Sequence, residues 1–354
     1  MDKFFKKSIG VDVGKDDLFF CACGITALQE VKVKGTRKLP NTPSGIREAL
    51  LWVGKHTKDT IPLTVTMEAT GIYHERLALA LQKAGYRTSV VLPNKARDYM
   101  KSLGLQSKTD AIDAKGLAQM GAEQHLQAWE PRSALYYELR LLTRHYEDMQ
   151  KTITGYNNRL HAMQRGMYRH AELEKSLQEF IGQMQSLGVE AERNIETLIK
   201  SDDYLAAKME KLTSIKGIAL LSAATIVAET NGFALFENIR QLESYAGYNV
   251  VEDQSGKRRG KTKISKKGNS HIRRILHMPA LNMVTYRVAP FAALYSRVYE
   301  RTKVKMKGYV AVQRKLLGLL YTLWKADRFF DPAYKITIKE KEPEPSFVLA
   351  SQKP

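Results

Sequence analysis

The sequence predicts a mixed α/β unit followed by a mainly helical region. In residues 1 to about 130, short β-branched apolar runs alternate with segments whose apolar residues recur every three or four positions, which is typical of a sheet domain with helices. After Pro131 the pattern changes, because residues 133–204 contain no proline and only four glycines. We therefore expect the fold class α/β plus α.

The first 131 residues carry the signals of a mixed sheet. Five β-branched or apolar runs are expected as strands: Ser8–Val13, Leu18–Cys23, Val31–Lys38, Leu63–Glu68 and Thr88–Leu92. Four further segments are expected as helices: Ser44–Lys55, Tyr73–Ala84, Asn94–Leu103 and Asp110–Met120. Gly85 should end the second helix, while Asn94 and Thr109 are the N-caps expected for the last two. Sequential strands followed by strand–helix alternation predict a mixed sheet.

The rest of the chain has helical patterns. Apolar residues spaced three or four apart predict two long helices over 133–204, antiparallel and packed as a coiled coil. Such a segment serves as a spacer or a dimerisation arm, although an ordinary helical subdomain has the same pattern. A mainly helical C-terminal domain should follow, and the Lys/Glu/Pro-rich end should be mobile. The predicted domain boundaries are 1–131, 132–208, 209–335 and 336–354.

Positive charge is the strongest compositional signal. The 354 residues carry a formal net charge of +19 with a pI near 9.7, which favours binding to a polyanion such as a nucleic acid. No apolar run approaches the ~20 residues of a membrane-spanning helix, so a membrane partner is not expected. The N-terminus leads straight into a strand and leaves no room for a signal peptide. We therefore expect a cytoplasmic, nucleoid-associated protein.

Four carboxylates in the first third of the chain have the residue types and placement of a metal-dependent phosphoryl-transfer site. Asp12 and Glu68 each interrupt a β-branched strand, where an ionised carboxylate is costly unless it is paired or bound to a metal. Asp110 and Asp113 are three residues apart on an expected helix and project from one face. Such oxygen ligands suit Mg²⁺ or Mn²⁺, which can clamp the reacting oxygens of a phosphodiester. Taken singly, each carboxylate is equally well explained as a cap, a turn contact or half of an ion pair.

A run of cations without an acidic residue lies between Gly256 and Arg274. Its members are Lys257, Arg258, Arg259, Lys261, Lys263, Lys266, Lys267, Arg273 and Arg274. Charge of one sign at this density cannot pack on itself, so we expect these residues to contact a phosphate backbone. Ser255 stands just before the run and is a candidate nucleophile, since cations beside it can stabilise a phosphorane. A serine beside glycine is more often part of a turn.

Short motifs along nearly the whole chain carry a family resemblance. Those of the first domain are Ile9–Asp12, Glu68–Tyr73 and Lys108–Ala114. Those of the C-terminal domain are Ile215–Ile218, Gln254–Gly256, Ser265–Asn269 and Arg273–Ala280. In this order and spacing they resemble the DEDD transposases of the insertion-sequence 110 family. One departure from the family's motifs lies in a helix-hairpin-helix-like turn, where Ala219 stands in place of a second glycine. This difference weakens the assignment of a phosphate-binding turn.

The resemblance implies a RuvC-like, RNase H-type first domain whose four carboxylates hold Mg²⁺ or Mn²⁺. It also implies a C-terminal transposase domain in which Ser255 is the covalent nucleophile. Such an enzyme cuts and rejoins double-stranded donor and target DNA through a phosphoserine intermediate, guided by a noncoding RNA that the element encodes. Ser255 lies more than a hundred residues from the carboxylates. Composite active sites in a homo-oligomer, a dimer or a tetramer, are therefore expected.

Two other classes of protein fit parts of the pattern. In a RuvC-like nuclease or Holliday-junction resolvase, the same carboxylates would activate water and Ser255 would have no role in the chemistry. An inactivated remnant that only binds nucleic acid would need neither the carboxylates nor Ser255. The presence of all four carboxylates together with Ser255 favours the transposase.

Overall fold

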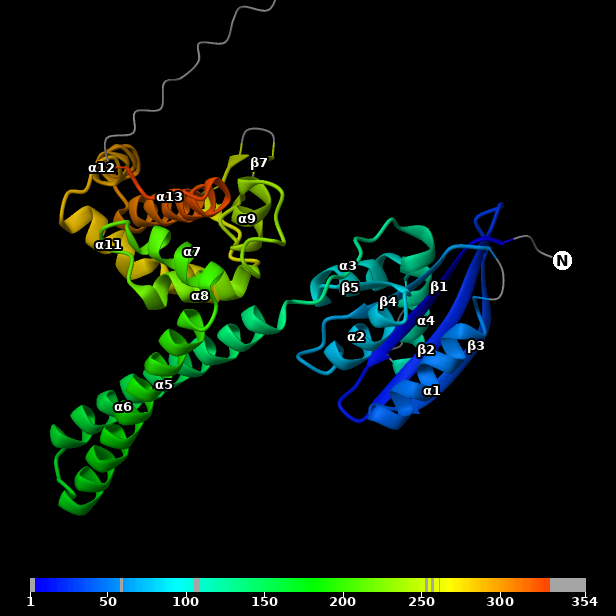
Figure 1. Ribbon diagram of the computed structural model, residues 1–354, viewed down its shortest axis with the longest axis horizontal. Helices are drawn as coiled ribbons and strands as arrows, with labels where there is room; N and C mark the ends of the chain where they lie inside the picture. The colour runs from blue at the N-terminus through cyan, green and yellow to red at the C-terminus, as the bar shows by residue number, and fades with distance from the viewer. Residues whose placement is uncertain are drawn as a thin grey trace, which may run out of the picture. The chain divides into compact units, whose positions relative to one another are not determined.

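The computed structural model describes residues 4–57, 60–104, 109–251, 254–255, 258–260 and 262–331, with only the backbone described at 254, 255, 258 and 259. The chain forms two compact units, Met1–Pro131 and Arg132–Pro354 (Figure 1). The predicted mobile tail, 336–354, lies outside the described residues. Within the described ranges, no helix has both the length and the apolar character needed to cross a membrane.

The first unit is built on one five-stranded sheet. Its strands are β1 (Phe4–Val13), β2 (Asp17–Thr26), β3 (Val31–Pro40), β4 (Leu63–Glu68) and β5 (Arg87–Val91). They lie in the order β3-β2-β1-β4-β5. The first three strands pair antiparallel, whereas β4 runs parallel to both β1 and β5. The predicted mixed sheet is confirmed.

Helices cover both faces of this sheet. They are α1 (Pro43–Gly54), α2 (Glu75–Lys83), α3 (Pro93–Ser102) and α4 (Asp110–Glu123). Side chains alternate between the two faces along a strand. Ile9, Val11 and Val13 are buried in an apolar core with residues of α1 and α2. Ser8 and Gly10 lie on the opposite face, against α4. The α4 face is the one that positions the candidate site.

The helix ends follow the predicted signals with one exception. Thr109 caps α4 by accepting a hydrogen bond from a first-turn N–H, and Gly85 adopts φ +81° just after α2. The N-cap predicted at Asn94 is wrong, because α3 begins at Pro93 and its N-cap is Leu92. Proline suits the first helical position, where no backbone N–H is needed for the helix.

Two long helices open the second unit, as predicted. α5 (Ala134–Gln164) and α6 (Ala171–Lys200) lie side by side as a helical hairpin (Figure 1). Buried residues at three- and four-residue spacing, such as Met149, Ile153 and Ile181, form the seam of a coiled-coil-like pair. This pair is called the arm below. The boundary predicted between the arm and the C-terminal domain stays a prediction, since both belong to the second unit.

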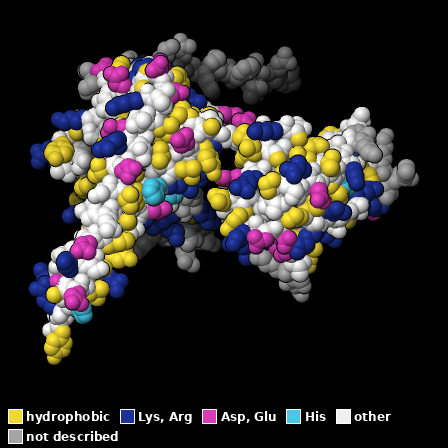
Figure 2. All heavy atoms as spheres, turned by 60° about the horizontal axis from the view of Figure 1, so that its bottom comes forward, with side chains coloured by type: hydrophobic (Ala, Val, Ile, Leu, Met, Phe, Trp, Pro, Cys, Tyr) yellow, Lys and Arg dark blue, Asp and Glu magenta, His cyan; other side chains and the backbone are white. Residues whose placement is uncertain are grey.

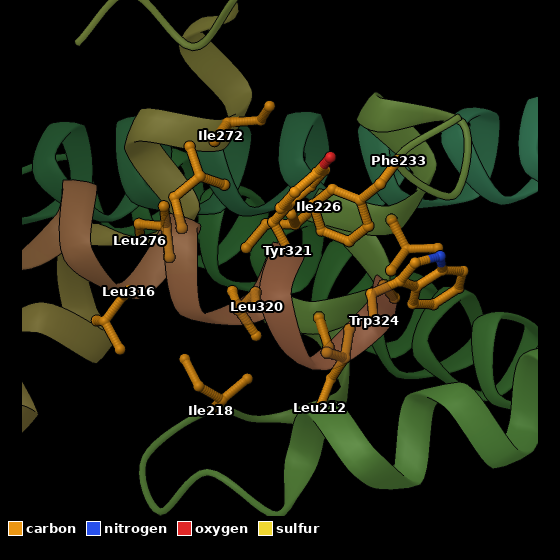
Figure 3. Packing of buried hydrophobic residues seen from close by; sticks show 14 of the residues in the cluster. Leu212, Ile218, Ile226, Phe233, Ile272, Leu276, Leu316, Leu320, Tyr321 and Trp324 are labelled. Carbon is orange, nitrogen blue, oxygen red and sulfur yellow. The ribbon is translucent and has the colours of Figure 1, made fainter. Parts of the chain in front are cut away.

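The remaining helices enclose one large apolar core. They are α7 (Asp203–Thr213), α8 (Leu220–Thr230), α9 (Ile239–Tyr245), α10 (Ser270–Ile275), α11 (His277–Thr285), α12 (Phe291–Thr302) and α13 (Lys305–Ala326). Figure 3 shows Leu316, Leu320 and Trp324 of α13 packed among apolar side chains from other helices of the unit. The turn Ile215–Ile218 joins α7 to α8, with Gly217 at φ +95°, a conformation that favours glycine.

Candidate active site

Asp12 and Glu68 lie at the carboxyl ends of two adjacent parallel strands. In the pairing of β1 with β4, the last partners are Val11 and Met67, and each carboxylate follows that pair by one residue. Both side chains are half-buried. The carboxyl ends of neighbouring parallel strands are where α/β sheets commonly gather functional groups. The strand register therefore brings the two predicted residues to one edge.

Both carboxylates also belong to the face of the sheet that α4 covers. A Cβ added at Gly10 would lie 2.0 Å from a backbone oxygen of α4, so residue 10 points at this helix. Thr66 of β4 points the same way, since its hydroxyl would lie 2.2 Å from a Cβ added at Gly121 of α4. Because side chains alternate along a strand, Asp12 and Glu68, each two residues further on, share that face.

The direction of α4 brings its first turn to the same end of the sheet. Gly121 packs over Ser8, whereas an earlier turn of the helix packs over Gly10, so the helix runs back along β1. Two strand residues advance about 6–7 Å, and four or five helical residues cover the same distance. The first turn of α4 therefore lies opposite the strand position two residues beyond Gly10. This turn contains Asp110 and Asp113.

The backbone thus places all four predicted carboxylates at one end and on one face. Asp113 is half-buried and Asp110 is exposed. Negative charge in the first turn is also favoured by the helix dipole, so the position of these two residues has an ordinary explanation as well. Across the described ranges, no three His, Cys, Asp or Glu side chains form a group that could hold a metal ion. The side chains as they lie do not form a closed set of ligands.

Ser255 lies near the tip of a β-hairpin in the second unit. The hairpin consists of two nested ladders: β6 (Val250–Val251) with β9 (Lys263–Ile264), and β7 (Gln254–Ser255) with β8 (Arg258–Arg259). The backbone of Ser255 pairs with that of Arg258, and only residues 256 and 257 lie between them. The predicted nucleophile therefore stands in the inner of the two ladders, opposite the first arginine of the cationic run. This segment, 250–264, is called the serine hairpin below.

Four of the predicted nucleic-acid-binding residues are exposed: Lys263, Lys266, Lys267 and Arg274. Outside the described residues lie Lys257, Lys261 and the side chains of Arg258 and Arg259. Figure 2 shows other Lys and Arg side chains spread over the visible face of the molecule rather than gathered in one patch. The surface charge is therefore not confined to the predicted run, whose binding of nucleic acid stays a prediction.

Arg273 and Arg274, at the end of that run, have partners within the protein. Arg273 Nη1 donates a hydrogen bond to the backbone oxygen of Ala246 at 2.7 Å. Arg274 forms an ion pair with Glu147 of α5. Each arginine therefore ties α10 to another segment of the second unit, in addition to any contact with nucleic acid.

Comparison with known proteins decides the family. A model of the DEDD transposases of insertion sequence 110, described as "Transposase", matches residues 9–168, and a model described as "Transposase IS116/IS110/IS902 family" matches residues 209–296. The chain belongs to the insertion-sequence 110 family of transposases. The first match contains the four carboxylates, and the second contains Ser255.

Curated relatives of this transposase match most of its length. The pilin gene-inverting proteins of Moraxella bovis and Moraxella lacunata are 27% and 28% identical to it over 327 residues, which is 92% of this chain and 98% of theirs. The transposase for insertion sequence element IS1111A of Coxiella burnetii is 23% identical, with 76% of each chain covered. Transposase membership makes the protein an enzyme that recombines DNA.

Solved structures similar to the transposase include Thermus thermophilus RuvC in complex with a Holliday junction substrate. That likeness covers 33% of this chain and 92% of RuvC, with 14% identity and a TM-score of 0.26. The Holliday junction resolvase of fowlpox virus is 13% identical, with 33% of this chain and 98% of the resolvase covered at a TM-score of 0.25. The mixed sheet and the helices described above confirm the predicted α/β plus α fold class.

The transposase also buries a charged cluster that its motifs did not reveal. The side chain of Glu229, in α8, is fully buried. Its carboxylate accepts hydrogen bonds from Arg144 Nε at 2.6 Å, Arg144 Nη2 at 3.1 Å and Asn269 Nδ2 at 2.6 Å, and Arg140 Nε lies 3.5 Å away. These partners are far apart in the sequence, so they form no local motif. The one sequence signal is a lone glutamate within the apolar helix Leu220–Thr230.

The partners of Glu229 set its protonation. Burial raises the pKa of the carboxyl group, but hydrogen bonding to Arg144, the charges of Arg144 and Arg140 and the hydrogen bond from Asn269 outweigh burial. The pKa of Glu229 therefore lies below its ordinary value of 4.5. A carboxylate with a lowered folded-state pKa stabilises the fold above its unfolded pKa. That stabilisation is lost as the pH falls through the folded-state pKa.

We expect Glu229→Gln to lower the free energy of unfolding at neutral pH by about 3 kcal/mol, because it leaves the half-buried Arg140 and Arg144 without their counter-charge. The difference from wild type should begin to shrink as the pH falls below about 4.5 and should be lost as the pH passes through the lower folded-state pKa, where the wild-type carboxylate also loses its charge. Urea unfolding at neutral and acidic pH measures both quantities. Glu190→Gln, at an exposed position of α6, is the control. A difference that stays constant with pH would contradict the role assigned to the charge.

Proposed function

We propose that this transposase cuts and rejoins DNA by metal-dependent phosphoryl transfer through a phosphoserine intermediate. The observation that carries the proposal is the convergence of Asp12 and Glu68 with the first turn of α4 at one end of the sheet. The position of Ser255 beside a hairpin turn, next to a cationic run, supports its assignment as the nucleophile.

The carboxylates suit the metal by their donor chemistry. Mg²⁺ and Mn²⁺ prefer oxygen ligands, and carboxylates from two strand ends and one helix supply them. The residues that would hold the ion are Asp12, Glu68, Asp110 and Asp113. When bound, the ion supplies charge neutralisation and orientation at the scissile phosphate.

The reaction runs in two transfers with no net loss of phosphodiester bonds. The Oγ of Ser255 attacks the scissile phosphorus in line, and the bond to the 3′ oxygen breaks. Ser255 gives up its hydroxyl proton, and the 3′ oxygen takes up a proton as it leaves as a hydroxyl. A 3′-hydroxyl of the other DNA segment then attacks the phosphoserine, which restores the serine and forms the new phosphodiester. Because bond energy is conserved, no nucleotide cofactor is needed.

The proposed partners follow from charge and from the separation of the reacting groups. A net charge of +19 suits double-stranded donor and target DNA and also the noncoding guide RNA expected from the family. The carboxylates and Ser255 belong to different compact units. Active sites shared between subunits of a homo-oligomer are therefore part of the proposal, and the enzyme would act on DNA in the bacterial cytoplasm.

Excision from a plasmid that carries the gene with its native flanks tests the carboxylates. We expect PCR across the circular junction to give product with wild type and to fall by at least about 10²-fold with Asp110→Asn or Asp113→Asn, which keep the side-chain shape but remove the charge. Asp98→Asn, at an exposed position of α3, is the matched control and should keep wild-type product.

Undiminished product from both site variants would overturn the metal-site assignment. Nicking of branched DNA without any junction product would instead favour a RuvC-like nuclease that hydrolyses DNA and does not rejoin it.

A further inference from the structure

We propose that Glu229 and Asn269 form a positioning pair for Ser255, which holds the base of the serine hairpin against the arm. The inference rests on the proposed role of Ser255 as nucleophile, and it adds residues that act through the serine rather than on the DNA. It is carried by the contacts of one buried carboxylate with α5 and with Asn269.

The first step is that stability alone does not account for this cluster. The glutamate must lose its hydration and the two half-buried arginines part of theirs, and apolar residues of similar volume often give equal or greater stability at such sites. What a charged, hydrogen-bonded cluster adds is a fixed geometry. Arg144 meets the carboxylate with two nitrogens, at 2.6 and 3.1 Å, which sets the orientation of Glu229 relative to α5.

The second step is the connection from Glu229 to the hairpin. Asn269 follows the hairpin and donates through Nδ2 to Glu229 at 2.6 Å. Its Oδ1 accepts from the N–H groups of His271 and Ile272 and thereby caps α10. Its backbone N–H donates to the oxygen of Tyr245, at the other end of the hairpin, at 2.7 Å. Through its side chain and its backbone N–H, Asn269 thus joins both sides of the hairpin base to the buried carboxylate.

Further backbone hydrogen bonds join the two sides of the hairpin base next to Asn269. The N–H of Ser265 donates to Asn249 O at 2.7 Å, and the N–H of Lys266 donates to Gly247 O at 3.1 Å. Gly268 fits only without a side chain, because an added Cβ would lie 2.3 Å from the oxygen of Tyr245. The base of the hairpin is therefore closely packed and hydrogen-bonded across its full width.

The third step concerns distance along the hairpin, because a small rotation at its base moves Ser255 by a larger amount. Ser255 is the sixth residue after Asn249, so the serine lies up to about 20 Å from the base. A tilt of about 3° at the base then moves the serine by about 1 Å, a displacement that can lower a reaction rate by about 10²-fold. Small changes in the contacts of Glu229 are thus enlarged at the nucleophile.

The same cluster holds the first residues of the second unit. Arg132 Nη1 donates to the backbone oxygens of Ala228 and Glu229, both at 3.2 Å. Its Nη2 lies 3.4 Å from the hydroxyl of Tyr245, which itself donates to Glu229 O. The segment by which the chain leaves the carboxylate-bearing unit is therefore fixed at the base of the serine hairpin.

Asn269→Ser is the variant that tests this inference, because a serine can still cap α10 while the Nδ2 donor to Glu229 is lost. Asn238→Ser is the matched control, since Asn238 caps α9 through Oδ1 in the same unit. In the full-length protein, we expect Asn269→Ser to lower the rate of junction formation by about 10²-fold. Its affinity for DNA should stay within about twofold, because no phosphate contact is removed. The control should match wild type in both.

Amide hydrogen exchange provides the readout that does not depend on catalysis. The N–H groups of Ser265 and Lys266 should exchange at least about 10-fold faster in Asn269→Ser, while those of the arm keep their wild-type rates. The inference would be overturned if both the amide exchange and the rate of junction formation stayed at their wild-type values. It would also be overturned if the rate, the affinity for DNA and the melting temperature all fell together. If Ser255→Ala retained wild-type activity, the proposed function would fail, and the exchange measurement alone would still decide whether Asn269 and Glu229 hold the hairpin.

Discussion

We expect Ser255→Ala to lower junction formation in the excision assay by at least about 10³-fold, because the proposed phosphoserine bond cannot form without the hydroxyl. DNA binding should be retained, since the cations that follow the serine are unchanged. With end-labelled DNA, the wild-type protein should form a covalent adduct that survives denaturation. Ser255→Ala should form none.

Ser270→Ala is the control for this experiment, because Ser270 is an exposed serine on the segment that follows the hairpin. It should give wild-type amounts of both junction and adduct. Junction product that survives the loss of Ser255 would exclude the covalent serine and would favour direct attack by a metal-activated hydroxyl.

Gly10→Ala is the second substitution with a large expected effect. The added Cβ would lie 2.0 Å from the backbone oxygen of Ala114 and 2.2 Å from the backbone nitrogen of Ala118. Main-chain atoms of a helix cannot rotate aside, so α4 must move off β1. We expect the free energy of unfolding to fall by about 3 kcal/mol. Junction formation should be lost even where the protein remains folded, because α4 carries Asp110 and Asp113.

Gly155→Ala in α5 is the matched control for Gly10→Ala. No atom lies within 4 Å of a Cβ added at Gly155, and alanine favours a helix over glycine by about 1 kcal/mol. The melting temperature should therefore rise slightly and activity should stay at the wild-type level. A Gly10→Ala protein with wild-type melting temperature and activity would show that the contact between β1 and α4 does not fix the site.

Much of the first unit could be predicted from local patterns. Strands such as Leu63–Glu68 consist of β-branched residues, whose preference for extended backbone is local. The first residues of β1, Phe4–Lys7, escaped prediction because they include two lysines and become strand through pairing with β2 and β4. The start of α3 was misplaced by one residue, because the sequence signal of Asn94 competed with that of Pro93 and the proline determined the helix start.

The candidate site likewise contains residues that local patterns predicted and residues that they did not. Asp12 and Glu68 were found because each interrupts a β-branched strand, and Asp110 and Asp113 because their spacing puts them on one face of an expected helix. The sheet register and the direction of α4 bring the four positions to one end of the sheet. Glu229 was missed because its partners lie far along the chain: Arg144 is 85 residues away and Asn269 is 40 residues away. No periodicity or spacing rule connects such residues. Only the packing of α5, α8 and the hairpin base does so.

The contact between Gly10 and α4 also bears on how this transposase can diversify. In an ordinary apolar core, one side chain can grow while its neighbour shrinks, so sequences drift with little loss. At Gly10 the strand meets main-chain atoms, and no neighbouring side chain can shrink to make room. Descendants of this protein should therefore keep this part of the first unit nearly unchanged.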